Sequence, residues 1–395
     1  MTDDAPPRRA TFAVGDVLDG KYRLERLLGE GGSSVVYVAQ VVAEPIDEPT
    51  AASRAPLVQR GDRVALKLIQ PHLAHDSQIS ARFAREARIL RRLAGDHVAS
   101  LLDYGELANG QLFMAQKWVT GESLDQLAGG KPMPAVRAMK ILLQVCTALE
   151  VAHEAGVIHR DLKPQNVIVD AREGKDHVHV LDFGMAKILR GELEESANAL
   201  TQQNMVFGTP EYLSPEQARG DDVDERADIY SAGVILYELV TGTVPFRAKA
   251  PIATMTAHVL EQPEPPSRRA PGATIAPALE GLVMHALAKQ PDERYPDART
   301  MAAAIRSAIE HPRDTESIRP PSPAPDPGLW DTDLALHMAE SVQPTQTQLE
   351  PPERVPGTAS AQPLGGVNRT MLLLGIAAAL LGIALGILVS LVGAK

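Results

Sequence analysis

The sequence predicts an α+β protein in which a strand-rich first part is followed by a larger helical part and then by a C-terminal transmembrane helix. Three observations lead to this expectation. Alternating apolar and polar residues, typical of half-buried strands, occur in residues 22–28 and 63–69. Longer apolar patterns with helical character occur in residues 135–153 and 228–242. Residues 371–392 carry no charge, and a run of this length can cross a bilayer.

Composition and charge limit the classes of protein to which the chain can belong. Its 395 residues are 44% hydrophobic, which is enough for one large or two ordinary globular domains. The net charge of −11 argues against a nucleic-acid partner, because proteins that neutralise phosphates usually carry a basic surplus. Cys146 is the only cysteine, so an intrachain disulfide is impossible. It lies in the apolar run 141–149, where a small buried side chain is expected.

The chain is expected to begin with a polar N-terminal tail over residues 1–21. The start of this tail contains charged residues and prolines but no apolar core of a signal peptide. A glycine-rich stretch follows at residues 29–37, Gly-Glu-Gly-Gly-Ser-Ser-Val-Val-Tyr. Its glycines allow a strand–turn–strand backbone to close over phosphate groups where a Cβ would collide. Taken alone, the same stretch is also compatible with a simple hairpin turn.

A lysine within an apolar strand is the next candidate. Residues 43–60 contain three prolines and are expected to form a loop inserted between two strands. Lys67 follows in an apolar strand pattern, and a buried ammonium group requires a carboxylate partner. Glu86, on a helix predicted over residues 77–93, is the expected partner. A surface ion pair of Glu86 with Arg82 is the alternative.

The stretch His-Arg-Asp-Leu-Lys-Pro-Gln-Asn at residues 159–166 carries the most specific chemistry. A hydroxyl that attacks a phosphoryl group needs a carboxylate to orient it and to accept its proton, and Asp161 supplies one. Lys163 can balance the charge of the phosphate, and Asn166 can bind a metal ion. The alternative is a helix-capping aspartate and a solvated lysine in an ordinary turn.

A second carboxylate comes at the end of a predicted hairpin. Residues 167–181 read as this hairpin, which brings Asp182 beside Asn166. Two oxygen ligands together with phosphates suit Mg²⁺ and not zinc. His177 and His179 alternate along the second strand. They are expected to lie on one exposed strand face, without a third metal ligand.

These motifs, in this order, resemble those of the protein kinases, and of the serine/threonine branch in particular. The pattern through Pro245 and Phe246 is similar to that of the bacterial eukaryotic-like serine/threonine protein kinases. The resemblance covers residues 22–309. It implies a bilobal protein-kinase fold, with a small β-rich N-lobe at residues 22–116 and a large helical C-lobe at residues 120–309. It also implies ATP and Mg²⁺ as cofactors and proteins as phosphoryl acceptors.

The resemblance further implies a role for each site residue. Asp161 would be the catalytic base, Lys163 would stabilise the transferred phosphate, and Asn166 and Asp182 would bind Mg²⁺. Thr209 would contact the catalytic aspartate and lysine. The residues implied in ATP binding form the glycine-rich loop, the phosphate clamp and the hinge: Leu28, Gly29, Glu30, Gly31, Gly32, Val36, Lys67, Glu86, Lys117 and Val119.

Some positions depart from the family pattern. Ser34 stands where the third glycine of the glycine-rich loop is usual, and it is expected to stiffen the loop. Gln116 gives a polar gatekeeper residue where an apolar one is usual. The stretch Gly-Thr-Pro-Glu-Tyr-Leu-Ser-Pro-Glu at residues 208–216 has Ser214 in place of an alanine.

The activation segment implied by the resemblance runs from Asp182 to Glu216. Ser196 and Thr201 are hydroxyls in its polar part, and Arg160 offers a guanidinium group to a phosphate there. Autophosphorylation is therefore expected, at Thr201 in preference to Ser196. An unmodified, solvated hydroxyl is the alternative.

Two braces of the large lobe are also implied. Glu216 is expected to form a buried ion pair with Arg294. Asp228 is expected to bind the backbone of residues 159–166, which correspond to the catalytic loop of the protein kinases. It stands at the start of a helix whose apolar character on nearly every face predicts burial at the centre of the lobe.

The chain after residue 309 changes character. Residues 310–368 are rich in proline, serine, threonine and glutamine and are expected to form a disordered linker. Residues 371–392 predict a single-pass helix that anchors the chain in the cell (inner) membrane, with the kinase domain on the cytoplasmic side, where ATP is. Gly382 and Gly386 form a GxxxG pair that permits a homodimer. A buried soluble helix is the alternative for this segment.

The predicted function is transfer of the γ-phosphoryl group of ATP to serine or threonine hydroxyls of proteins in signalling. A membrane-tethered pseudokinase scaffold is the alternative, and the intact catalytic and metal-binding residues argue against it. A kinase of small molecules is a second alternative. Lys163 and the sequence of residues 208–216 disfavour it, because a peptide-binding shelf has no use with a small substrate.

Overall fold

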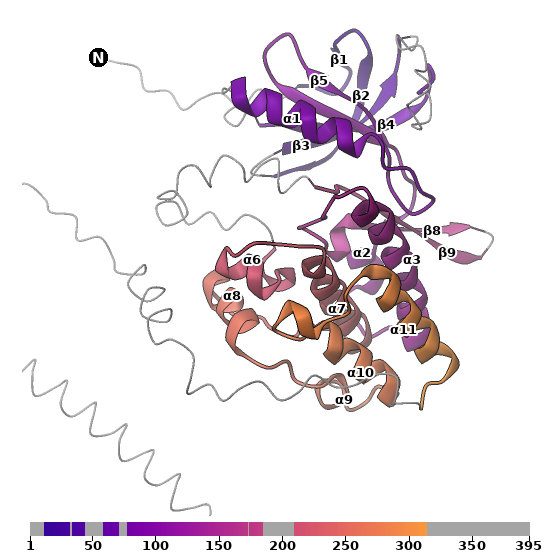
Figure 1. Cartoon of the computed structure of the whole chain (residues 1–395). Helices are drawn as coiled ribbons and strands as arrows, with labels where there is room; N and C mark the ends of the chain where they lie inside the picture. The colour runs from indigo at the N-terminus through magenta and orange to yellow at the C-terminus, as the bar shows by residue number, and fades with distance from the viewer. Residues whose placement is uncertain are drawn as a thin grey trace, which may run out of the picture. The chain divides into compact units, whose positions relative to one another are not determined.

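The computed structural model of the chain describes residues 12–31, 34–43, 58–70, 77–172, 174–184 and 209–313. These residues belong to the first of two compact units, Met1–Trp330 (Figure 1). Within the described ranges, no helix has both the length and the apolar composition that crossing a membrane requires. Several predictions lie outside the described residues: Gly32, most of the loop 43–60, Ser196, Thr201, the linker after residue 313 and the span 371–392.

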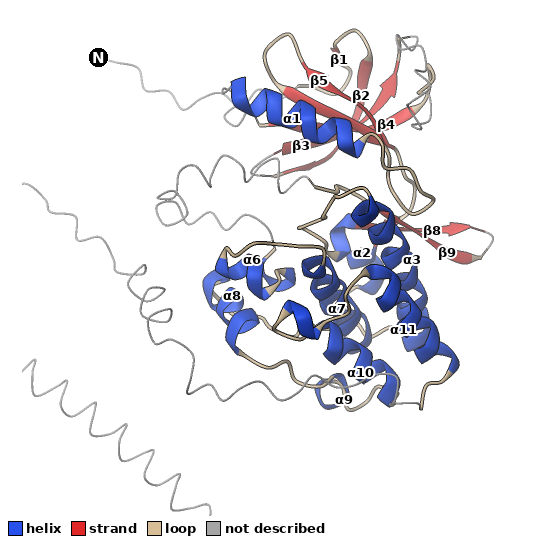
Figure 2. Cartoon of the chain, in the orientation of Figure 1, coloured by secondary structure: helices blue, strands red, loops and turns tan. Residues whose placement is uncertain are grey.

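The N-lobe contains a six-stranded antiparallel sheet and helix α1 (Ser77–Leu90), as Figure 2 shows. The strand order is β1–β2–β3–β4–β6–β5. Phe83, Ala87 and Leu90 of α1 are buried, because their spacing of three and four residues places them on one helix face. The strands are β1 (Val17–Leu18), β2 (Tyr22–Glu30), β3 (Ser34–Val41), β4 (Arg63–Ile69), β5 (Leu101–Glu106) and β6 (Leu112–Lys117).

The sheet begins earlier than the sequence indicates. β1, which pairs with β2, lies inside residues 1–21, the segment predicted as a polar tail. Gly15 N donates to Leu24 O at 2.8 Å, and Leu18 is buried. The polar tail is therefore shorter than predicted. Two residues are too few to show strand periodicity, so only the pairing with β2 reveals this strand.

The C-lobe is mainly helical and is centred on α7 (Arg226–Thr241). α7 is buried on nearly all sides, as its apolar sequence predicts. Gly233 of α7 allows α10 (Pro277–Ala286) to approach closely, because a Cβ at this position would lie 2.8 Å from the Cβ of Ala286. The other described elements are α2 (Leu124–Ala128), α3 (Ala135–Glu154), η2 (Pro164–Asn166), η3 (Pro210–Tyr212), α6 (Pro215–Arg219), α8 (Pro251–Leu260), α9 (Pro266–Arg269), η4 (Pro291–Glu293) and α11 (Ala298–Glu310).

A small three-stranded sheet contains the hairpin that connects Asn166 to Asp182. Arg137 of α3 holds its hairpin through Asp176, with nitrogen–oxygen distances of 2.8 and 2.9 Å. Leu181 N, just after the hairpin, donates to Asn166 O, just before it, at 2.8 Å. This bond places Asp182 next to the catalytic loop, as the sequence predicts. The strands, in sheet order, are β7 (Glu122–Ser123), β8 (Val167–Arg172) and β9 (Lys175–Val180).

The prediction that His177 and His179 lie on one exposed strand face is wrong. His179 is only 3% exposed, because the segment between α1 and β5 packs on the hairpin. In this contact Val180 N donates to His97 O at 2.8 Å, and Ala99 N donates to Val180 O at 3.0 Å. The rings of His97, His177 and His179 pack in sequence, with centroid distances of 4.9 and 4.7 Å. In the described part of the chain no group of three or more histidine, cysteine or acidic side chains could hold a metal ion.

Candidate active site

The backbone of the catalytic loop, residues 159–166, is fixed by a fully buried aspartate of α7. The Asp228 carboxylate accepts hydrogen bonds from His159 N at 2.8 Å and from Arg160 N at 2.9 Å. His153 of α3 contacts the same carboxylate at 2.8 Å. Burial alone would raise the pKa of Asp228, but the hydrogen bond and charge of His153, with the His159 backbone, lower it below its usual value. The predicted brace is therefore confirmed.

Further contacts fix the loop from its other neighbours. The His159 ring nitrogen Nε2 lies 2.8 Å from Leu181 O, which links the loop to the segment that leads into Asp182. The side-chain amide of Gln217 donates to Arg160 O at 2.7 Å. Arg160 has a φ of 65°, in the left-handed region that a non-glycine residue seldom adopts. These bonds hold a backbone conformation that is costly in isolation.

Asp161, Lys163 and Asn166 converge at the surface of the loop. Lys163 Nζ lies 2.8 Å from Asp161 Oδ2. Asn166 Nδ2 donates to Asp161 O at 2.8 Å and lies 3.5 Å from Asp161 Oδ2. The Asp161 side chain stays 32% exposed, so a substrate hydroxyl can reach it. The three predicted catalytic groups thus form one cluster, with a carboxylate oriented by a cation and an amide.

Lys67 of β4 pairs with Asp182 and not with the predicted partner. Lys67 Nζ lies 2.7 Å from Asp182 Oδ2. Among the described residues Glu86 is paired with Arg85, at 3.2 Å, and not with Lys67. The predicted Lys67–Glu86 pair is therefore not formed in this structure. The sequence shows only that Lys67 needs a carboxylate; tertiary packing decides which of two nearby carboxylates lies within reach.

Asp182 is held as a carboxylate. Burial alone would raise the pKa of Asp182, but the charge and hydrogen bond of Lys67, followed by His159 and a side-chain hydrogen bond from Gln116, lower it. Asp182 also has a left-handed backbone, with a φ of 57°. Gln116, the polar gatekeeper on β6, thus contributes to the site through Asp182. Lys67 and Gln116 thus keep Asp182 ionised, in the segment that Leu181 N joins to Asn166 O of the catalytic loop.

The glycine-rich loop lies at the β2–β3 turn. Gly31 N donates to Ser34 O at 2.8 Å, which closes the turn. Gly29 and Glu30 lie in the last part of β2, paired with β3. Leu28, just before them, is an apolar side chain that remains 39% exposed. The end of β2 thus leaves the apolar side chains of Leu27 and Leu28 exposed beside a glycine backbone.

The remaining predicted nucleotide-binding residues lie on the neighbouring strands. Val36 of β3 is directly opposite Lys67 in the β3–β4 register. Lys117 ends β6, and its backbone N–H donates to Ser100 O at 2.9 Å, so this N–H is not available to adenine. Val119 follows in the connection to β7 and is partly exposed.

Thr209 is not brought into the predicted contact. It lies directly before η3, within the described part of the C-lobe. The hydrogen bonds of the described residues include none from its hydroxyl to Asp161 or Lys163. The Asp161 carboxylate is instead satisfied by Lys163 and Asn166.

Two polar residues that contribute to the site, Gln217 and His153, escaped the sequence reasoning, and the contact of the predicted gatekeeper Gln116 with Asp182 was not foreseen. Gln217 forms a capping box with Ser214 at the start of α6 and also binds Arg160 O, as described above. The pattern Ser-x-x-Gln is a recognisable capping signal and could have drawn attention to Gln217. His153 and Gln116 carry no comparable local signal, because their roles depend on contacts with Asp228 and Asp182 across the fold.

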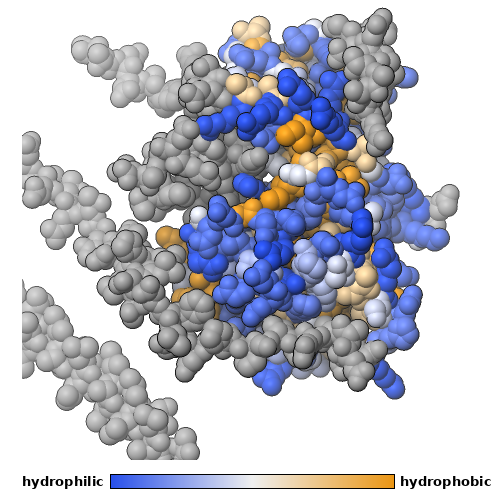
Figure 3. All heavy atoms as spheres, in the orientation of Figure 1, coloured by the Kyte–Doolittle hydropathy of each residue, from blue (hydrophilic) through white to orange (hydrophobic). Residues whose placement is uncertain are grey.

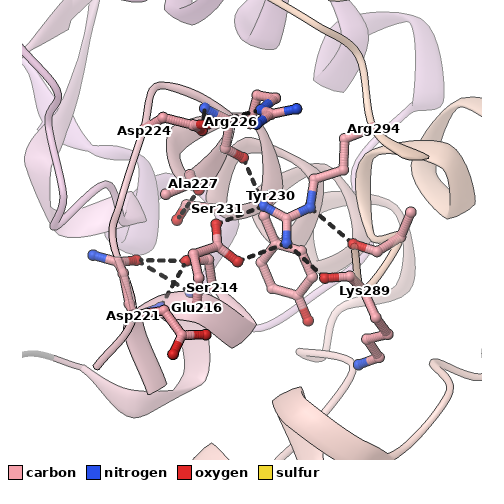
Figure 4. A network of polar contacts seen from close by, with 12 residues as sticks. Ser214, Glu216, Asp221, Asp224, Arg226, Ala227, Tyr230, Ser231, Lys289 and Arg294 are labelled. Atoms are coloured by element: carbon pink, nitrogen blue, oxygen red, sulfur yellow. Dashed lines mark hydrogen bonds and ion pairs between the residues drawn. The ribbon is translucent and has the colours of Figure 1, made fainter. Parts of the chain in front are cut away.

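The end of the activation segment rests on a buried ion pair, shown in Figure 4. The Arg294 guanidinium contacts both carboxylate oxygens of Glu216 at 2.7 Å, and the two side chains are 0% and 4% exposed. It also lies over the Tyr230 ring, 4.9 Å from the centroid. The predicted Glu216–Arg294 pair is thus confirmed. The remaining guanidinium bonds, at 2.8 to 3.0 Å, go to the backbone carbonyls of Arg226, Ala288 and Lys289.

The donor set suits a hard divalent cation. Asn166 uses its Nδ2 to bind Asp161, which leaves its Oδ1 as an oxygen donor. Asp182 supplies an ionised carboxylate. It contacts Lys67, and this lysine could also bind a phosphate. Carboxylate and amide oxygens, completed by phosphate and water oxygens, are what Mg²⁺ requires. The residues present therefore fit the Mg²⁺ and ATP that the sequence implies.

The fold and the site together define a class of protein. A strand-rich lobe that supplies a lysine and a helical lobe that supplies the aspartate–lysine–asparagine cluster and a second aspartate are the parts of a protein kinase. The family model for the protein kinase domain matches residues 49–312. The chain therefore belongs to the protein kinase family.

Two similar relatives are named serine/threonine-protein kinases. The chain is 41% identical over 306 residues to serine/threonine-protein kinase pkn3 of Myxococcus xanthus, covering 77% of this chain and 53% of pkn3. It is 38% identical over 292 residues to serine/threonine-protein kinase PknB of Mycolicibacterium smegmatis, covering 73% of this chain and 43% of PknB. The chain thus spans about half the length of these relatives.

A solved structure supports the same fold. The PknI kinase domain of Mycobacterium tuberculosis is similar with a TM-score of 0.55 and 27% sequence identity. The match covers 75% of this chain and 99% of that domain. The similarity therefore extends over both lobes and across the whole of a kinase domain.

Proposed function

We propose that this protein is a serine/threonine protein kinase that transfers the γ-phosphoryl group of ATP to hydroxyls of protein substrates. The observation that carries the proposal is the cluster of Asp161, Lys163 and Asn166, with Asp182 joined to Lys67 at its edge. The names of the relatives, which are serine/threonine-protein kinases, support the choice of acceptor.

Each residue has a defined task in this reaction. Asp161 orients the substrate hydroxyl and takes its proton as the new oxygen–phosphorus bond forms and the bond to the β-phosphate oxygen breaks. Lys163, 2.8 Å from Asp161, balances the charge that develops on the transferred group. Asn166 and Asp182 would hold Mg²⁺, which neutralises phosphate charge when bound. Lys67, now paired with Asp182, would bind the phosphates when ATP and Mg²⁺ are present.

The direct test is phosphoamino-acid analysis of the full chain with labelled ATP and Mg²⁺. We expect phosphoserine or phosphothreonine with the natural chain and a loss of at least roughly a hundredfold with Asp161→Asn, which keeps the shape but removes the base. Asp170→Asn, at a partly exposed hairpin carboxylate paired with Arg172, is the matched control and should leave the rate unchanged. Equal labelling in both variants would overturn the assignment of Asp161.

We further propose activation by autophosphorylation, at Thr201 in preference to Ser196. Arg160 supports this proposal, because its Nε is buried and makes no hydrogen bond in the described part of the chain. It lines a cavity of about 130 Å³ together with Glu86 and Gly184. A phosphate would supply the missing acceptor. Mass spectrometry of active protein should find phosphate on Thr201, and the absence of phosphate from residues 185–207 would contradict the proposal.

Membrane anchoring is proposed on the sequence of residues 371–392. Twenty-two consecutive uncharged residues match the thickness of a bilayer, and the kinase domain would lie on the cytoplasmic side of the cell (inner) membrane. The Gly382–Gly386 pair supports a homodimer within the membrane. The test is recovery of the full chain, and not of a chain ending before residue 371, in carbonate-washed membranes.

A catalytically silent scaffold tethered to the membrane is the second candidate. It shares the anchor and the fold but predicts that phosphotransfer does not matter. The Asp161→Asn variant separates the two, because a scaffold would keep its cellular effect when the base is removed. Loss of both labelling and cellular effect would favour the kinase.

A further inference from the structure

Three arginines form a straight row on the outer face of α1. Arg85, Arg88 and Arg92 are all exposed and lie within about 60° of one another around the helix, opposite the buried Phe83 and Ala87. Arg92 lies two residues after Leu90, the last residue of α1. It stays in line because Arg91 N still donates to Ala87 O at 2.9 Å and Arg92 N to Ile89 O at 3.0 Å. We call Arg85, Arg88 and Arg92 the arginine row.

The arginine row is a local positive surface on an acidic protein. Residues 77–93 contain five arginines and one acidic residue, whereas the whole chain has a net charge of −11. Figure 3 shows hydrophilic side chains along α1. Arg85 is 68% exposed on its side chain and contacts Glu86 at 3.2 Å. Arg88 and Arg92 have no ion-pair or hydrogen-bond partner for their side chains among the described residues.

An ordinary solvated helix face would alternate acidic and basic residues. Like charges three and four positions apart repel each other, and the spacing of Arg85, Arg88 and Arg92 repeats this arrangement twice. Bound anions would reduce the repulsion between these three guanidinium groups. The row follows a convex, exposed helix and is about 10 Å long, which suits a flat array of anions and not a single ligand in a pocket.

We propose that the arginine row docks on an anionic phospholipid surface. The inference rests on the proposed membrane span at residues 371–392. The linker predicted over residues 310–368 would tether the kinase domain to this anchor, so the lipid headgroups would be at high local concentration. Headgroup phosphates are the bidentate acceptors that guanidinium groups prefer.

Docking would act on the catalytic site through Glu86. Arg85 donates to Glu86 at 3.2 Å, so a headgroup phosphate competes with Glu86 for the Arg85 guanidinium. Glu86 lies on the face of α1 that lines the cavity beside Arg160 and Gly184. The arginine row is therefore placed to couple membrane contact to the position of the predicted clamp carboxylate.

The test uses the full chain with Ala81→Cys, labelled with a fluorophore and reconstituted in vesicles. Ala81 is exposed on the same face as the arginine row, and the only natural cysteine, Cys146, is buried, so labelling is selective. One set of vesicles is phosphatidylcholine alone and the other also contains phosphatidylglycerol. Quenching of the fluorophore by spin-labelled lipid headgroups reports contact.

We expect quenching in the phosphatidylglycerol vesicles, weakened by salt and absent from phosphatidylcholine. Replacing all three arginines of the row by glutamine should lower the ratio of docked to undocked protein roughly a hundredfold, about fivefold for each charge. The control removes three exposed cations from the C-lobe by Lys131→Gln, Lys140→Gln and Arg268→Gln and should leave quenching unchanged.

The two proposals fail in different ways. Flotation of the chain with both kinds of vesicle, without quenching, would overturn the docking of the arginine row and leave the anchor standing. A chain that does not float with phosphatidylcholine vesicles would overturn the anchor and, with it, this inference. A label that is already shielded from solvent without lipid would show that another surface covers α1. That result, or quenching that the row variant does not reduce, would also overturn the docking of the arginine row.

Discussion

Buried charged groups hold the catalytic loop and the end of the activation segment, whereas Lys67 of the N-lobe meets Asp182 through one partly exposed ion pair. Asp228 and the Glu216–Arg294 pair lie within the C-lobe with almost no exposure and make several hydrogen bonds each. The Lys67 and Asp182 side chains are 11% and 24% exposed and share one contact of 2.7 Å.

This difference shows which parts of the site are fixed and which can be rearranged. A buried charge that loses its partner keeps its full desolvation penalty, so the C-lobe network has no alternative arrangement of similar energy. Lys67 can exchange Asp182 for a phosphate or for another carboxylate with little loss, because water still reaches the pair. We therefore expect substitutions in the buried C-lobe network to affect folding, and the substitution of Lys67 to affect mainly catalysis.

The largest effect is expected from breaking the buried pair. Arg294→Met should lower the free energy of unfolding by about 3 to 5 kcal/mol, because Glu216 would remain buried without a partner. Urea denaturation measures this loss. Adding Glu216→Leu should restore part of the stability, since it removes the unpaired charge. A loss below roughly 1 kcal/mol for the single variant would show that the C-lobe network is no more rigid than an exposed pair.

Removing Lys67 should give the opposite pattern. We expect Lys67→Met to lower kcat roughly 10²- to 10³-fold, the cost of losing one electrostatic group from a phosphoryl-transfer site. The free energy of unfolding should change by less than it does in Arg294→Met, because the Lys67 and Asp182 side chains are 11% and 24% exposed and the Glu216–Arg294 pair is not. Steady-state kinetics and urea denaturation of the same sample check both parts. A large loss of stability would remove the contrast between the two lobes.

His179, buried in the β8–β9 hairpin, should make the free energy of unfolding depend on pH. Burial, aided by the charges of His177 and Arg172, lowers the pKa of His179 to about 4. A histidine in the unfolded chain titrates near pH 6.5, so the unfolded state binds the proton first. Stability contributed by neutral His179 is thus complete above pH 6.5 and is lost as the pH falls toward 4, by up to about 1.4 kcal/mol per pH unit.

His179→Phe should make the pH dependence of unfolding less steep in this range, because a phenyl ring cannot bind a proton. Urea denaturation between pH 6.5 and 4 measures the slope, and the exposed His311→Gln is the control that should leave it unchanged. An unchanged slope in His179→Phe would mean that His179 is readily protonated in the folded protein.

The smallest effect is expected for an exposed pair of the N-lobe. Arg63 and Glu25 lie 2.8 Å apart with side chains 59% and 28% exposed. A double-mutant cycle with Arg63→Ala and Glu25→Ala should give a coupling free energy of about 0.2 to 1 kcal/mol, reduced by salt. A coupling as large as that of the buried pair would show that exposure does not separate the two kinds of ion pair.

The sequence by itself determined the elements whose signals are local. The catalytic loop at residues 159–166 carries its chemistry in eight consecutive residues, and Asp182 follows a hairpin whose two strands are visible as apolar runs. The uniform apolar character of α7 predicted its burial. These features were predictable because a short stretch of chain contains all the groups that define them.

Only the tertiary structure decided the contacts between distant parts of the chain. Which carboxylate meets Lys67 depends on how α1 and the segment before Asp182 are placed relative to β4, and the structure selects Asp182 over Glu86. β1 exists only through pairing with β2, and His179 is buried only because the segment after α1 covers it. Periodicity reports whether a side chain faces inward, but the identity of its partner is fixed by packing between elements far apart in sequence.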